Sequence, residues 1–241
     1  MRRWLDRYQR GDRVGVWTEM TSLGPEIGTE ELAEAFVVVR ETMRRVRQNV
    51  ERLVERLPAI GYVFAETADL PVFAPPPADI EDRLDDLEAR VGRLPLALRG
   101  WYQEVGMVSL VGRHPQWAYE YHDPLVVDAP IDFVLSEYAE WDEDRGTEWD
   151  RGPFTIDIAP DCLHKANISG GAPYGMRVPN IGVDGLLLWE PHHTTFVNYL
   201  RIAFAWGGCP GWGRGALDGW ARPAEPPPST LAEIAAEMLA I

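Results

Sequence analysis

A long run of apolar residues at helical spacing places the strongest constraint on how this chain folds. From Leu32 to Ile60, successive apolar positions are separated alternately by four and three residues, which is the heptad pattern of a helix with one continuous apolar seam. Thr29 precedes the pattern as a suitable N-cap, and Pro58 and Gly61 are suited to end it. We therefore expect one long helix whose seam has to be covered by other apolar groups.

Two interpretations account for the cover of this seam. The first is a homodimer in which the Leu32–Ile60 helices of two copies form a coiled coil. The second is packing of the seam against two short helices expected within residues 4–23, whose large apolar side chains, such as Trp4 and Trp17, also need burial. We favour the second interpretation, and the homodimer remains an alternative.

Composition and charge limit the classes of function. The chain has 241 residues, of which 46% are hydrophobic and 25% charged, as in ordinary folded domains. Its two cysteines, Cys162 and Cys209, fit a reducing compartment better than a disulfide scaffold. The net charge of −15 argues against nucleic-acid binding, because phosphate neutralisation needs a basic surface. No segment approaches the roughly 18 apolar residues of a membrane helix, so we expect a cytoplasmic protein with no membrane partner.

The pattern along the chain predicts three parts and an α+β fold class. Residues 1–60 are expected to form a helical unit, and residues 61–78, which are rich in proline, an extended linker. In residues 79–241, two helices are followed by short runs typical of strands, with further helices between and after them. Helices followed by an irregular, mostly antiparallel sheet are typical of α+β domains.

Several motifs after residue 79 occur in a recognisable order. An acidic helix at residues 80–92 ends in glycine, and Leu94 and Pro95 then open a second helix that also ends in glycine. Strands follow, and the segment 158–161, of sequence Ile-Ala-Pro-Asp, precedes a glycine turn and another strand. Over residues 79–205 this order resembles the SUKH superfamily, which includes a yeast cell-wall synthesis regulator and many bacterial immunity proteins. The resemblance implies a sheet flanked by helices and a non-enzymatic binding module that neutralises a toxin.

The segment 137–150 combines acidic and aromatic side chains and is the main candidate for a binding site. Seven of its fourteen residues are acidic and three are aromatic. Aromatic residues supply contact area at interfaces, and acidic residues steer a basic partner. The alternative is a solvated helix end with a charged loop. A nuclease toxin is basic because it binds phosphates, so we hypothesise that such a toxin contacts Glu140, Trp141, Asp142, Glu143, Asp144, Glu148 and Trp149.

A second hypothesis is a metal-dependent or Cys/His hydrolase. Its candidate residues are Asp161, Cys162, His164, His192 and His193. Cys162 and His164 are two residues apart, so in a strand their side chains share a face. Zinc motifs such as Cys-x2-Cys or His-Glu-x-x-His are missing, however. We therefore expect a turn aspartate, a buried thiol and strand-end imidazoles, in a non-enzymatic protein without a cofactor.

Two further expectations concern the neighbourhood of this cluster. Lys165 is the only lysine of the chain, which suggests either a Schiff-base nucleophile or an exposed cation among many acids, and we expect the exposed cation. The glycine-rich stretch 169–173 lies between residues 164–168 and 174–178, a pattern that predicts a β-hairpin.

Overall fold

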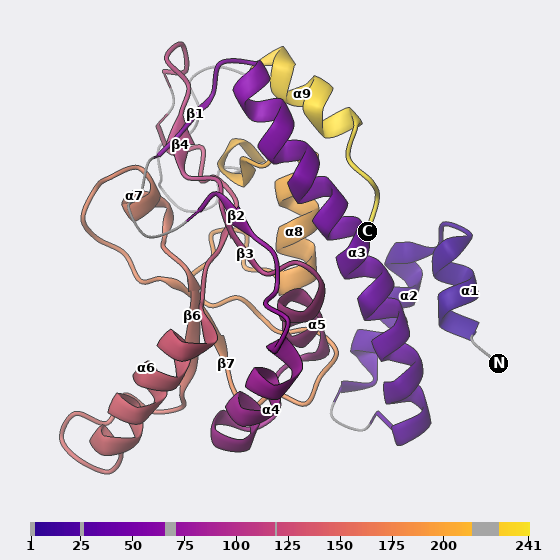
Figure 1. Ribbon diagram of the computed structural model, residues 1–241, viewed down its shortest axis with the longest axis vertical. Coiled ribbons are helices and arrows are strands. Elements are labelled where there is room, and N and C mark those ends of the chain that lie inside the picture. Colours follow the sequence, from indigo (N-terminus) through magenta and orange to yellow (C-terminus); the bar gives the residue numbers. More distant parts are fainter. Residues whose placement is uncertain (1–2, 25–26, 66–70, 119, 214–226) are drawn as a thin grey trace.

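The protein has an α+β fold, seen in a computed structural model that describes residues 3–24, 27–65, 71–118, 120–213 and 227–241 (Figure 1). Nine α-helices and one 3₁₀ helix lie in these ranges. They are α1 (Arg3–Gln9), α2 (Arg13–Ser22), α3 (Thr29–Ala59), α4 (Ile80–Val91), α5 (Leu96–Glu104), α6 (Ile131–Asp144), α7 (Cys162–Lys165), α8 (Phe196–Ala205), η2 (Pro210–Gly213) and α9 (Ser229–Ala236). Within the described residues, no helix combines the length and the low charge needed to cross a membrane.

The strands of the described residues are short and pair in three antiparallel sheets. They are β1 (Val63–Phe64), β2 (Phe73–Ala74), β3 (Met107–Ser109), β4 (Gly112–Arg113), β5 (Val126–Val127), β6 (Thr155–Ala159) and β7 (Tyr174–Arg177). β1 pairs with β4, the order β2-β3-β5 forms a second sheet, and β6 pairs with β7. Val108 is the centre of the second sheet and lies opposite both Phe73 and Val127. Antiparallel pairing together with separate helices confirms the predicted α+β class.

The predicted long helix is α3, and its seam is buried within this chain. Val39, Met43 and Leu53 have no exposed surface. Val39 and Met43 lie directly against Gly100 of α5, where an added Cβ would come within 2.5 Å of the Val39 side chain. The prediction that α1 and α2 cover the seam was therefore incomplete, because a helix much later in the sequence also packs on it. From Val39 to Leu57 the seam is buried within one chain, whereas Leu32, Phe36 and Ile60 at its ends are partly buried.

The C-terminal segment packs along the same long helix. Asn49 of α3 is fully buried, and its side chain donates a hydrogen bond to the carbonyl oxygen of Leu239 at 2.9 Å. The same side chain accepts a hydrogen bond from the Leu239 amide at 2.7 Å. Arg52 donates to the carbonyl oxygen of Glu237 at 2.8 Å. Both backbone groups of Leu239 are thus paired with one buried side chain of α3.

The segment expected to be a linker takes part in the sheets. Residues 61–65 and 71–78 supply β1 and β2, which pair with β4 and β3, the strands that follow α5. The buried apolar residues before this segment and after it belong to one continuous core.

The predicted hairpin around the glycine-rich stretch was wrong. β7 pairs with β6, with Ile156 opposite Met176, whereas residues 162–165 form the helix α7. The Asp161 side chain accepts a hydrogen bond from the Leu163 amide at 2.7 Å and so caps this short helix. The glycine-rich stretch is therefore part of the connection from α7 to β7.

Candidate protein-interaction surface

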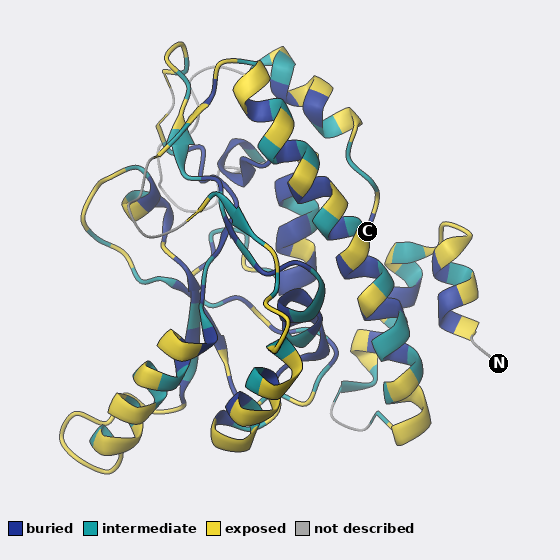
Figure 2. Ribbon diagram, in the orientation of Figure 1, coloured by how far each residue is buried: buried dark blue, intermediate teal, exposed yellow. Residues whose placement is uncertain are grey.

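Helix α6 carries most of the predicted contact segment; its first turn is buried in the body, and Tyr138 further along it contacts the ring of the buried Phe154. Ile131 and Val134 are its buried residues, and Pro130 stands at its start. The rest of the helix and the loop after it extend away from the core in Figure 1, and Figure 2 shows this part as mainly exposed. A helix held in this way presents its polar side chains to solvent and to any partner.

The two tryptophans of the segment lie in different environments. The indole nitrogen of Trp141 donates to the carbonyl oxygen of Gly152 at 2.7 Å, and its ring centroid is 5.5 Å from that of Phe154. Trp141 thus fastens the returning loop to the helix. Trp149, at the tip of the loop, is 69% exposed. Trp149 is therefore the aromatic residue of this segment that is open to contact with a partner.

The acidic side chains of the segment are mostly in solvent. Asp142 forms an ion pair with Arg145 at 3.1 Å, and Asp144 with Arg151 at 3.5 Å, both at exposed positions where such pairs are weak. Asp150 accepts hydrogen bonds from two backbone amides of the loop, and these bonds lower the pKa of its carboxyl group. The remaining exposed acids of the predicted set are Glu140, Glu143 and Glu148.

A second acidic helix lies beside α6 and was not assigned to the surface from the sequence. α4 runs next to α6 (Figure 1), and Arg83 of α4 joins Asp132 of α6 by an ion pair of 3.2 Å. Together, α4 and α6 carry eleven acidic residues and two arginines. Arg99 of α5 forms ion pairs with three of the acids, so part of this charge is compensated. We name this two-helix surface the acidic face; its exposed acids on α4 are Glu81, Asp82, Asp85 and Asp86.

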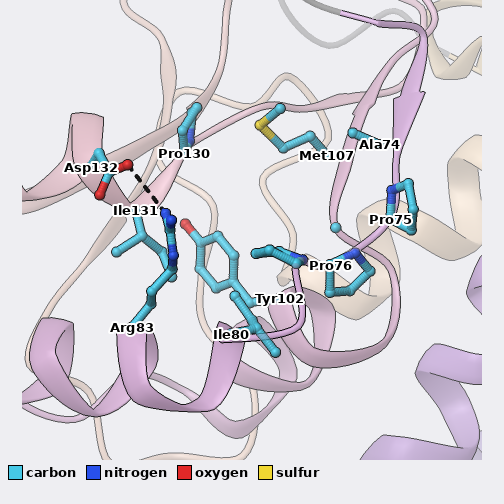
Figure 3. Close-up of a pocket in the computed structure, with 12 residues that line it drawn as sticks. Ala74, Pro75, Pro76, Ile80, Arg83, Tyr102, Met107, Pro130, Ile131 and Asp132 are labelled. Carbon is cyan, nitrogen blue, oxygen red and sulfur yellow. Dashed lines mark hydrogen bonds and ion pairs between the residues drawn. The ribbon is translucent and has the colours of Figure 1, made fainter.

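An apolar groove opens where the two helices begin. Its accessible volume is about 200 Å³, below the usual range of small-molecule sites, which starts at about 300 Å³. Figure 3 shows Tyr102, Pro130 and Ile131 on one side of the groove and Met107 and Ala74 on the other, with the Arg83–Asp132 ion pair at its edge. The remaining lining residues are Pro75, Pro76, Pro77, Ile80 and Gly106.

The residues of the alternative hydrolase site are divided between two places. On α7, Nδ1 of His164 is hydrogen-bonded to the carboxylate of Asp161. In a separate turn, Nδ1 of His192 is 2.5 Å from the carboxylate of Glu190, while His193 is exposed. Across the parts of the chain that the structure describes, no three His, Cys, Asp or Glu side chains come together in a way that could hold a metal ion. The predicted set is thus not brought together as a metal site.

Cys162 is a buried cysteine outside any disulfide, as expected, but its local structure differs from the prediction. It begins the helix α7, whereas a strand or strand end was predicted. On a single helical turn, positions two apart do not face each other, so Cys162 and His164 do not share a face. The geometry that would support a nucleophile–base pair on one strand face is therefore not formed.

The prediction that Lys165 is exposed was wrong. Its side chain is fully buried, and Nζ is 2.7 Å from Oδ1 of Asp123, whose side chain is also fully buried. The hydroxyl of Tyr174 donates to the other carboxylate oxygen of Asp123 at 2.9 Å. The ammonium also lies 4.6 Å from the centroid of the Tyr174 ring. The helix cap at Asp161 starts α7 in the orientation that turns Lys165 inward. No local sequence pattern marks Asp123 as its partner, because the two residues are 42 positions apart.

The groove was also missed by sequence reasoning. Its signals were present separately, as the proline run 75–77 and the helix start at Pro130, but their meeting depends on tertiary contacts. Comparisons with protein-family models, with curated proteins and with solved structures found no match for this chain.

Proposed function

We propose that this protein is a cytoplasmic, non-enzymatic binding module of SUKH type that holds a basic protein, by its chemistry a nuclease-like toxin, on the acidic face. The observation that carries the proposal is the pair of neighbouring helices α4 and α6, with eleven acidic residues against two arginines. Such a concentration of one charge on one side of a protein attracts partners of the opposite charge.

Two physical contributions are expected at this face. Exposed acids raise the rate of association with a basic partner, and the effect is screened beyond about 8–10 Å near physiological ionic strength. An exposed aromatic side chain such as Trp149 supplies contact area that slows dissociation. Steering is therefore expected from the acids of the acidic face, and anchoring from Trp149 in the loop that follows α6.

The test begins with capture of partners from a lysate of the host, using the whole chain as bait, and continues with binding kinetics. The variant Asp142→Asn, Glu143→Gln, Asp144→Asn is expected to slow association strongly at low salt and weakly at high salt. Trp149→Ala is expected to raise the dissociation rate by a factor that corresponds to about 1–4 kcal/mol.

A matched control removes the same charge elsewhere. Exposed acids on α3 and α9 are neutralised in the variant Glu30→Gln, Glu55→Gln, Glu233→Gln, which should associate nearly as fast as the parent. A captured toxin expressed alone should arrest growth, and co-expression of this chain should relieve the arrest. If the captured partners are not basic, or if both triple variants bind as the parent does, the acidic face is not the binding site.

A further inference from the structure

We infer that the apolar groove at the start of α4 and α6 receives one large apolar side chain of the partner, flanked in the partner by arginine or lysine. This inference rests on the proposed function, because it concerns how a basic protein is held on the acidic face. The groove adds a contribution to binding that charge does not provide, because an apolar side chain of the partner is buried there away from water.

The size and lining of the groove favour a single side chain. Its volume of about 200 Å³ is too small for most cofactors and suits one aromatic or long aliphatic group. Tyr102 is nearly buried at the groove, and its hydroxyl donates to the carbonyl oxygen of Ala129 at 2.8 Å, so that the ring is fixed. Met107, a flexible and polarisable side chain, lies on the opposite side (Figure 3). A rigid wall and an adaptable one together can enclose side chains of somewhat different shape.

The charges at the rim favour a cation next to that side chain. Arg83 is shared between Asp79, at 2.9 Å, and Asp132, at 3.2 Å. Two carboxylates and one guanidinium leave a net charge of one unit negative at the edge. The Asp132 side chain is 82% exposed although it is paired with Arg83, so its carboxylate is also accessible to a guanidinium or ammonium of the partner. The rim is therefore complementary to a basic segment, as is the acidic face around it.

The backbone near the groove disfavours binding by strand addition. β2 is an edge strand of its sheet and stands immediately before Pro75, Pro76 and Pro77. Prolines have no amide hydrogen to donate, so an added strand would not pair beyond β2. A partner segment is thus held through its side chains, and the groove is the apolar recess next to this edge.

The experiment uses the whole chain with methyl-labelled methionine and three synthetic pentapeptides. Each peptide has two arginines on either side of a central tryptophan, leucine or alanine. The tryptophan peptide is expected to bind at least about tenfold more tightly than the alanine peptide, since a buried large side chain contributes a difference of this order. Binding should shift the methyl resonance of Met107, while the fully buried Met20 and Met43 remain unchanged.

A substitution distinguishes the contribution of the groove to peptide binding from that of the surrounding charge. Ile80→Glu makes the acidic face more negative but places a carboxylate in the apolar lining, so binding of the tryptophan peptide should weaken about tenfold or more. Ile181→Glu makes the same charge change at an isoleucine that is 40% exposed and outside the groove, and it should bind at least as well as the parent.

Each result decides the inference. Equal binding of the tryptophan and alanine peptides, an unmoved Met107 resonance, or no binding of any peptide overturns it. If Ile80→Glu does not fold, the peptide comparison on the parent chain still decides. If the groove does not bind the side chain, the Asp142, Glu143, Asp144 variant still associates with the partner more slowly at low salt. If the proposed function is wrong, that salt-dependent slowing is absent.

Discussion

Replacement of the buried lysine by an apolar side chain of similar length provides a quantitative test of the interior electrostatics. In Lys165→Met the aliphatic stem keeps its packing, but the ammonium that lies 2.7 Å from the Asp123 carboxylate is lost. Both side chains of this pair are fully buried, so water does not screen their interaction. The variant therefore has to keep an aspartate in the core without the cation that Lys165 supplies.

The expected loss of stability follows from the burial of the pair. Removal of one partner of a buried ion pair costs about 3–5 kcal/mol, compared with about 5–15 kcal/mol for the whole stability of a typical protein. For a chain of this size, each kcal/mol lowers Tm by roughly 2–4 °C, so a decrease of roughly 6–20 °C is expected. Asp123→Asn in the same background removes the buried negative charge and should restore about 2 kcal/mol.

Urea unfolding at neutral pH, followed by circular dichroism, measures these differences. A change in stability shifts the urea concentration at the midpoint, while the slope of the unfolding free energy against urea stays constant. Tyr174→Phe is the matched control, because it removes one hydrogen bond to Asp123 and leaves the ion pair, and it should cost only about 1 kcal/mol. If the free energy of unfolding of Lys165→Met is within about 1 kcal/mol of that of the parent, the ion pair does not stabilise the fold as the structure implies. The reasoning would also be refuted if the changes in unfolding free energy caused by the Lys165 and Asp123 substitutions simply added in the double variant.

Two further predictions concern other buried polar groups. Partial burial raises the pKa of Asp184 to about 6. The folded state therefore holds a proton that the unfolded state has released, and stability should fall by about 1–3 kcal/mol as pH rises from about 4 to 6. Asp184→Asn should flatten this pH dependence in thermal unfolding, and an unchanged profile would contradict it. Asn49→Ala should lower the free energy of unfolding by about 2 kcal/mol and speed hydrogen exchange at the Leu239 amide, which donates a hydrogen bond to Oδ1 of Asn49 at 2.7 Å. Exchange as slow as in the parent would show that the contact is unimportant.

The candidate site was only partly visible from the sequence. The acidity of residues 137–150 is a matter of composition and needs no fold. The distinction between Trp141 and Trp149 needs the fold, because only tertiary structure brings the Gly152 carbonyl and the Phe154 ring to one of them. The groove likewise combines residues 74–77, 80, 102, 107 and 130–132, which are distant in the chain.

The sequence by itself determined the helices whose signals are local. The heptad spacing specified α3, and Gly92, Pro95 and Gly106 marked the limits of α4 and α5, because periodicity, caps and proline act over a few residues. The tertiary structure decided the pairing of β7 with β6 and the burial of Lys165. Strand pairing and the burial of a charge depend on groups far away in sequence, and local spacing carries no information about which of them will meet.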